Sequence, residues 1–243
     1  MAYQPQGLAV LILDKIVDLI GDPRTQPISK HFIGKKFMCK LPNGQLYFES
    51  KLALDTDGSQ FAIPDATGHK QDPTGQEATS ARDKDGNFLD ADRINYFVLP
   101  GGGFAARHGI RIGDIGIVIN GILTAFACYG DDGPANSLGE GSISLHRELG
   151  HETVVNGRLK NAGLPGGVIT IVFPGSGNSF GRTNQESAAV GRPLFQGLLK
   201  EAENLYQLRL AKLQQSLGQE LLREEEEIIK HPPHRSLRDD RYR

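Results

Sequence analysis

The chain has 243 residues, of which 38% are hydrophobic and 23% charged, proportions that suit one globular domain with appendages and exclude a disordered or collagen-like protein. Its 27 Lys and Arg residues nearly balance 29 Asp and Glu residues, for a net charge of −2, so no overall field favours nucleic acid or an anionic membrane as partner. The 30 glycines and 13 prolines indicate many tight turns and exclude a plain helical bundle, which predicts a mainly β protein.

The cysteines and the N-terminal stretch argue against a disulfide-rich, zinc-binding or membrane protein. Cys39 and Cys128 stand far apart, which favours two buried thiols over a disulfide framework or a cysteine-ligated zinc site. The apolar stretch from Leu8 to Leu13 has no basic leader and no cleavage-site pattern, so it does not resemble a signal peptide. No run approaches the roughly 18 apolar residues of a membrane helix. We expect no membrane partner.

The chain begins with a predicted amphipathic helix. Between about Gly7 and Ile20 the apolar side chains recur three and four residues apart, with charged residues between them. Residues 21–23, Gly-Asp-Pro, then end the helix.

A β domain follows. From about residue 37 to residue 173 the sequence consists of short runs rich in β-branched and aromatic residues, separated by Gly, Asp, Asn and Pro. The dipeptide Asn120-Gly121 accepts the positive φ angles of a type I′ turn, so it predicts a hairpin between the fourth and fifth runs. The six predicted strands are residues 36–40, 46–54, 96–99, 115–119, 122–129 and 168–173.

Two further segments of this domain have distinct patterns. Residues from Ser142 to Leu149 carry apolar side chains at helical spacing before Gly150, which predicts a short helix with a glycine stop. The stretch from Pro64 to Asp92 is polar and too long for an ordinary connection in a compact domain, so we interpret it as a binding loop.

After Gly191 the apolar residues form an eleven-residue stripe. This period predicts a long helix that runs nearly straight or with weak right-handed supercoil, in contrast to a leucine zipper. The sequence thus predicts an N-terminal helix in residues 1–22, a β domain in 30–180, and a long helix with a polar tail in 191–243. Self-association or docking through residues 196–230 stays open. The stripe consists of Leu199, Ala202, Tyr206, Leu210, Leu213, Leu217, Leu221 and Ile228.

A zinc-like pattern is set aside. His146, Glu148 and His151 resemble a zinc motif, but histidines five residues apart with Gly150 between them do not share one helical face. The run after residue 173 lacks the Lys and Ser/Thr of a phosphate loop. The sequence therefore predicts no metal and no organic cofactor.

The densest chemical signal lies between Tyr129 and Ser142, where Asp131 ends an apolar strand and Glu140 follows nine residues later. Cleavage of a glycosidic bond needs such a carboxyl pair, one to protonate the leaving oxygen and one to activate water. Spacing alone favours a second interpretation, in which Asp131 caps a turn and Glu140 caps the following helix.

A family resemblance bears on this choice. The run Gly-Asp-x-Gly-Pro at residues 130–134, with Gly-Glu-Gly-Ser at 139–142, closely resembles the core of glycoside hydrolase family 75, the fungal-type chitosanases. Six further pieces occur in the family's order, so the resemblance extends from about Phe48 to Ser176. These pieces are residues 52–58, 69–71, 79–80, 89–92, 96–100 and 171–176.

The resemblance implies a compact six-stranded barrel of double-psi type and an endo-acting, inverting hydrolase of β-1,4-linked glucosamine polymers such as chitosan. Carried onto this chain, Asp131 would be the general base and Glu140 the general acid, although the assignment of the two roles could be reversed. Asp55 and Asp57 match the family's acidic strand end and would receive ammonium groups of the substrate, since carboxylates attract a polycation.

Other positions complete the expected site. Asp132 would add a subsite charge, and Tyr129 would offer an aromatic face to a sugar ring, with three further aromatic candidates at Tyr47, Tyr96 and Phe104. All four rings are also natural core residues. Members of the family are typically exported, so the localisation of this chain is left open. Two alternatives also remain: a non-catalytic polysaccharide-binding or assembly module, and a hydrolase of peptidoglycan or partly acetylated chitin.

Overall fold

The computed structural model describes residues 16–160 and 162–230. Contacts divide the chain into two compact units, with the boundary between Ala202 and Glu203. The first unit holds the β domain and the beginning of the long helix, and the second holds the rest of that helix.

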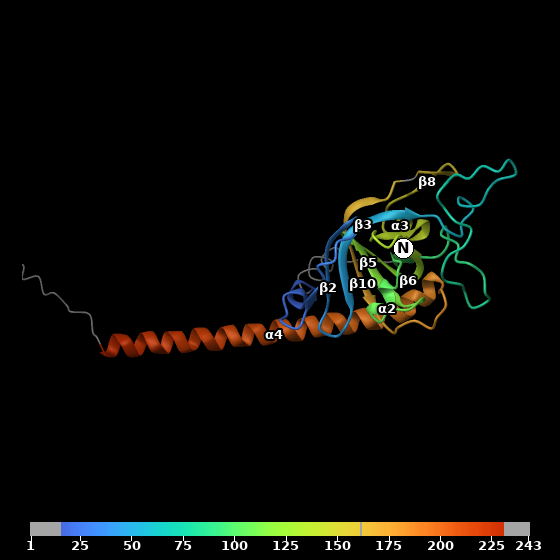
Figure 1. The fold of residues 1–243 in the computed structure, drawn as a ribbon. Coiled ribbons are helices and arrows are strands. Elements are labelled where there is room, and N and C mark those ends of the chain that lie inside the picture. The colour runs from blue at the N-terminus through green and yellow to red at the C-terminus, as the bar shows by residue number, and fades with distance from the viewer. Residues whose placement is uncertain (1–15, 161, 231–243) are drawn as a thin grey trace, which may run out of the picture. The chain divides into compact units, whose positions relative to one another are not determined.

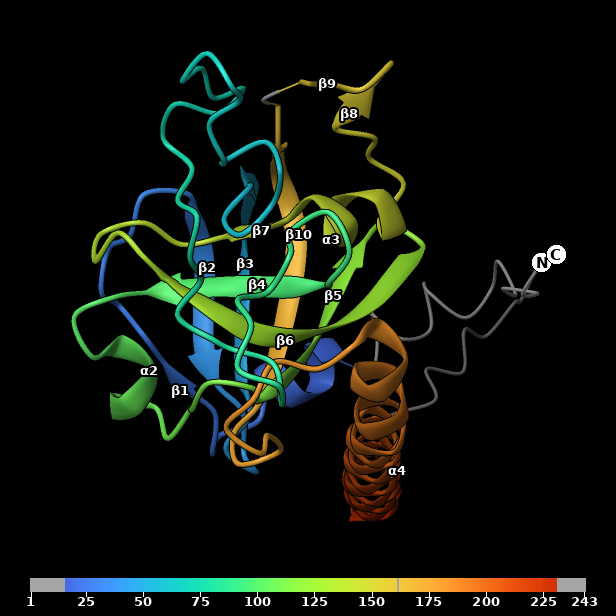
Figure 2. The same ribbon diagram turned by 90° about the vertical axis from the view of Figure 1, so that its right-hand side faces the viewer.

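Six strands of the first unit close into a barrel, as predicted. Their order is β3-β10-β5-β6-β4-β7, and β7 pairs back onto β3. The pairs β3–β7 and β4–β6 are parallel and the others antiparallel. In Figure 2, β4 and β6 run across the view in front of β3 and β10. The barrel strands are β3 (Leu46–Asp55), β4 (Tyr96–Pro100), β5 (Ile115–Asn120), β6 (Leu123–Gly133), β7 (Glu140–Ser142) and β10 (Leu164–Phe173).

The six predicted strands are not the six strands of the barrel. The first, β2 (Lys35–Lys40), lies outside the ring, where it pairs with the first half of β3 and with β1 (Gln26–Pro27). The barrel closes instead through β7, which sequence analysis missed because three residues centred on Gly141 show no alternation of apolar and polar side chains. A two-stranded hairpin, β8 (Val154–Val155) with β9 (Arg158–Leu159), was also missed.

The predicted hairpin between β5 and β6 exists, but its turn is shifted by one residue. Asn120 pairs with Leu123, so the two loop residues are Gly121 and Ile122. Among these, only Gly121 has a positive φ, of 58°. A single positive φ at the first loop position is typical of a type II′ turn, so the predicted type I′ turn is wrong.

Apolar strand residues fill the barrel. Every residue from Ile115 to Ile119 in β5 is buried, as is every residue of β4. Cys39 and Cys128 are both fully buried free thiols, as predicted, and burial raises the pKa of each to about 11. Figure 1 shows β3, β10, β5 and β6 as the neighbouring strands around this core.

Short helices flank the barrel. The predicted helix at Ser142–Leu149 is α3 (Ile143–Glu148), with Ser142 as its N-cap. A further helix, α2 (Phe104–Arg107), was not predicted. Of the N-terminal helix the structure describes residues 16–20, which end before Gly21. Its predicted beginning near Gly7 lies outside the described residues.

The long helix α4 (Asn184–Lys230) begins seven residues before the predicted start at Gly191. A capping box explains the difference: the Glu186 amide donates to the Thr183 hydroxyl, and the Thr183 amide donates back to the Glu186 carboxylate. Pro193 lies inside the helix. None of the helices in the described residues is long and apolar enough to cross a membrane.

Candidate active site

The barrel brings Asp131 and Glu140 to opposite sides of one residue. Val98 of β4 pairs with Asp131 of β6 on one side and with Glu140 of β7 on the other. Residues directly opposite in a sheet point to the same face, and two strand spacings separate their Cα atoms by about 9–10 Å. Both carboxyl groups therefore reach one face of the sheet, where one could protonate a leaving oxygen and the other activate a water molecule.

Asp131 is held in one orientation. It is 6% exposed, and its Oδ1 accepts the Ser80 amide at 2.9 Å, the Ser80 hydroxyl at 2.5 Å and the Asp132 amide at 2.8 Å. Burial raises the pKa of Asp131 above its ordinary value, while the hydrogen bonds from Ser80 oppose that rise. Because all three donors lie on Oδ1, the other oxygen is left for a water molecule.

Glu140 begins β7, the strand that closes the barrel against β3. Its Oε1 accepts the hydroxyl of Ser137 at 2.9 Å. A Cβ atom at Gly133 would lie 3.1 Å from Oε2, so the absence of a side chain there leaves room for this carboxyl. The cap of α3 is Ser142, whose hydroxyl accepts the Leu145 amide at 3.1 Å. The interpretation of Glu140 as a helix cap is therefore wrong.

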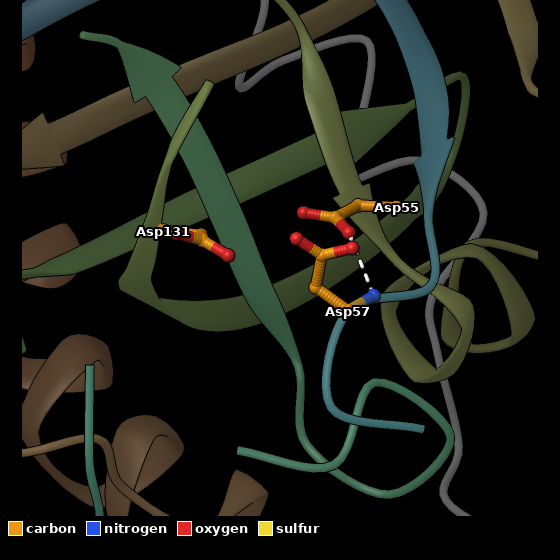
Figure 3. A group of neighbouring side chains, drawn as sticks. All are labelled: Asp55, Asp57 and Asp131. Atoms are coloured by element: carbon orange, nitrogen blue, oxygen red, sulfur yellow. Dashed lines mark hydrogen bonds between the residues drawn. The ribbon is translucent and has the colours of Figure 1, made fainter. Parts of the chain in front are cut away.

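Asp55 and Asp57 lie beside Asp131. Figure 3 shows their carboxylates next to each other, with Asp131 pointing toward them from β6. Oxygen atoms of all three lie within 4.8 Å of one another. Oδ1 of Asp55 accepts the Asp57 amide at 2.9 Å, and Oδ1 of Asp57 accepts the Gln76 amide at 2.7 Å. Closely spaced oxygens are ligands that a divalent cation would accept, but they also compete for protons.

Crowding changes the protonation of this cluster. Burial raises the pKa of Asp55 well above its usual range, and the charges of Asp57, Asp131 and Glu140 raise it further. Burial likewise raises the pKa of Asp57 to about 6, against the opposing hydrogen bond from Gln76. Crowding of the carboxylates therefore favours the protonated form of Asp55 and of Asp57.

We expect these raised pKa values to make stability depend on pH. A carboxyl with a raised pKa in the folded state stabilises the fold below its unfolded pKa of about 3.9, and this contribution is lost as pH rises through the folded value. For Asp57 the loss occurs between about pH 4 and pH 6 and amounts to at most about 3 kcal/mol. Asp57→Asn should flatten the pH dependence of the unfolding midpoint and raise the midpoint at pH 7.5. A parent chain that is as stable at pH 7.5 as at pH 5 would contradict this.

Asp131 and Glu140 line a cleft of about 320 Å³ together with Asp55 and Asp57. Its walls carry six acidic side chains and no Lys, Arg or His, so the cleft is acidic. A slightly larger cleft, of about 340 Å³, lies between residues 83–94 and 178–186. That cleft mixes acidic residues with Arg93 and Arg182 and contains none of the carboxylates beside Val98. The acidic cleft is therefore the candidate site. Its acidic residues are Asp55, Asp57, Asp72, Asp131, Asp132 and Glu140.

The other residues predicted for the site lie as follows. Asp132 is exposed at the edge of the cleft. Tyr129 is only 2% exposed, and its hydroxyl donates to Asp132 at 2.7 Å, while its ring stacks on Phe97. This placement favours a supporting role for Tyr129 over direct contact with a sugar. The three further aromatic candidates are also buried: Tyr47, Tyr96 and Phe104.

Sequence analysis assigned no role to several residues that build the cleft. Ser80 orients Asp131, and Ser137 contacts Glu140. Asp72 accepts hydrogen bonds from Thr56 and Thr74. Burial works against the charge on Asp72, but these hydrogen bonds lower its pKa below the ordinary value. Asp72 and Ser80 belong to the long polar loop, whose interpretation as a binding loop agrees with their position.

The zinc-like histidine pair has a different setting. His146 is fully buried, and its two ring nitrogens each lie 3.0 Å from a backbone carbonyl oxygen, of Ser142 and of Leu52. Burial lowers the pKa of His146. The ring thus connects α3 to β3 close to the strand pair that carries Asp55 and Glu140.

Comparison with known proteins identifies the family of the chain. No curated protein matches the chain. The family model of the fungal chitosanases of glycosyl hydrolase group 75 matches residues 52–206, which is more than half of the chain and includes all six acidic residues of the cleft. The chain therefore belongs to the group 75 glycosyl hydrolases and is a glycosidase of the chitosanase type.

Proposed function

We propose that the protein cleaves internal glycosidic bonds of the chitosan polymer, with inversion at the anomeric carbon. Asp131 and Glu140 are the catalytic pair in this proposal. The observation that carries the proposal is their placement on either side of Val98, on one face of the sheet. Catalysis needs no metal or organic cofactor in this scheme.

In the proposed reaction Asp131 acts as general base. Its free oxygen takes a proton from a water molecule whose oxygen attacks the anomeric carbon of the sugar. Glu140 acts as general acid and gives its proton to the glycosidic oxygen of the leaving chain. The bond between the anomeric carbon and that oxygen breaks, and the two carboxyl groups end with their protonation states exchanged. Proton transfer through solvent then restores them.

The acidic walls explain a preference for a glucosamine polymer. Each deacetylated sugar carries an ammonium group at mildly acidic pH. The cleft is lined by six acidic side chains and by no Lys, Arg or His. The carboxyl groups that line the cleft would attract these ammonium groups, since a concave site of one charge sign concentrates ligands of the opposite sign. An N-acetyl group has no charge and gains nothing from this field.

The first test is to incubate the purified chain with soluble, fully deacetylated chitosan and follow the new reducing ends by proton NMR. Inverting cleavage of a β-linked polymer forms the α-anomer first, before mutarotation mixes the two forms. Initial release of the β-anomer would contradict inversion. Release from partly acetylated chitin or peptidoglycan but not from chitosan would contradict the proposed substrate. Binding of chitosan without any release would favour a non-catalytic module.

A further inference from the structure

The second unit exposes an apolar stripe on α4. Exposed fractions are 47% for Tyr206, 38% for Leu210, 60% for Leu213, 58% for Leu217 and 61% for Leu221. Steps of four, three, four and four residues keep these five side chains within about 80° of one another around the helix axis. We call this set the leucine stripe. Within the described residues, it has no apolar surface packed over it.

A stripe of this kind is not expected to remain in water. In proteins most helical stability comes from packing an amphipathic face against other surfaces, and less from intrinsic propensity. Gly218 directly follows Leu217 and weakens the helix by about 1 kcal/mol relative to alanine. The stability of this part of α4 therefore calls for a partner surface.

The charges along the helix favour a second copy in antiparallel orientation. Arg209 and Glu227 are 18 residues apart, five full turns, so they lie on the same flank of the stripe. In a parallel pair the exposed run from Glu224 to Glu227 would lie beside the same run of the other copy. In an antiparallel pair centred near Leu217, Arg209 of each copy lies close to Glu227 of the other, so both ends gain opposite-charge contacts.

We propose that the protein is a homodimer in which the leucine stripes of two copies pack antiparallel, with the two-fold axis near Leu217. The interface is self-complementary: Leu217 faces its own copy, Leu213 of each copy faces Leu221 of the other, and Arg209 of each copy lies close to Glu227 of the other. This inference does not depend on the reaction of the barrel.

The test of dimer formation is the mass of the full chain measured by light scattering after size-exclusion chromatography. We expect a dimer for the parent chain and a monomer for the double variant Leu213→Glu and Leu217→Glu. The matched control, Gln215→Glu with Gln219→Glu, adds the same charge to the opposite face and should remain dimeric. A monomeric parent chain would overturn the proposal, and so would a control that dissociates as fully as the stripe variant.

Single cysteines test the orientation. Cys39 and Cys128 are fully buried, so a cysteine placed on the stripe reports on the helix. In the antiparallel dimer, Leu217→Cys lies near its own copy and forms an intermolecular disulfide. Leu210→Cys lies about 21 Å from its copy along the axis, beyond the roughly 7 Å that a disulfide spans. A parallel dimer would cross-link at both positions. That result would contradict the antiparallel orientation but not the formation of a dimer.

Discussion

Asp131→Asn and Glu140→Gln should each lower the rate of chitosan hydrolysis by about 10²–10⁴-fold, the usual contribution of general acid–base catalysis. In Asp131→Asn the remaining side-chain oxygen still accepts the Ser80 and Asp132 amides, so the local hydrogen bonds survive while the oxygen that takes the proton is replaced by an amide nitrogen. In Glu140→Gln the remaining oxygen still accepts the Ser137 hydroxyl, but the amide is no acid. The measurement is initial release of reducing ends at saturating chitosan, with the unfolding midpoint recorded for each variant.

A control variant distinguishes the loss of a catalytic carboxyl group from the effect of removing any one negative charge. Asp85→Asn removes one exposed carboxylate outside the acidic cleft, and its rate should stay within about twofold of the parent, as for most surface changes. Both catalytic variants should unfold at or above the parent's midpoint, since each removes a charge from a partly buried site. A catalytic variant that retains more than a tenth of the parent's rate would rule its carboxyl out of the pair.

The two roles can be told apart with an activated substrate. An aryl glycoside of a glucosamine oligomer has a leaving group that departs without protonation, so it needs the general base but not the general acid. We expect Glu140→Gln to recover most of the parent's rate on this substrate and Asp131→Asn to recover none. The reverse pattern would exchange the roles of Asp131 and Glu140.

Sequence reasoning predicted the strands that alternate or are continuously apolar, because burial leaves that pattern in the side chains. It failed where structure depends on partners far along the chain. β7 is three residues long and exists because β3 and β4 hydrogen-bond to it on both sides. The early start of α4 could have been predicted from Thr183 and Glu186, which stand three residues apart as in a capping box.

The candidate site shows the same limit. The eight residues between Asp131 and Glu140 contain no information on the distance between the two carboxyl groups, because that distance is set by the pairing of both strands with Val98, more than 30 residues upstream. The pair was predicted from family resemblance and not from spacing. Ser80 and Asp72 belong to a loop without periodicity, so no pattern indicated which of its polar residues would turn toward the cleft.

Gly139→Ala should destabilise the protein by about 4 kcal/mol or more, an effect reserved for substitutions with a severe steric or strain mechanism. Gly139 has a φ of 82°, and a Cβ atom there would lie 2.0 Å from the backbone oxygen of Lys51 and 2.3 Å from the hydroxyl oxygen of Ser50. Backbone cannot yield as a flexible side chain does. The carbonyl oxygen of Gly139 also accepts the Ala53 amide at 2.8 Å, so the clash would disrupt the pairing of β7 with β3.

Gly68→Ala is the matched control for that change. Gly68 has nearly the same φ, 81°, but a Cβ atom there meets nothing within 4 Å. Its substitution therefore measures backbone strain alone, about 1–2 kcal/mol. Urea unfolding of both variants gives the difference, which is the cost of the close approach at Gly139. Equal losses would mean that the contact is relieved easily. β7 carries Glu140 and β3 carries Asp55. Any Gly139→Ala protein that still folds should therefore show a lower rate of chitosan hydrolysis, measured on the folded fraction, whereas folded Gly68→Ala should keep the parent's rate.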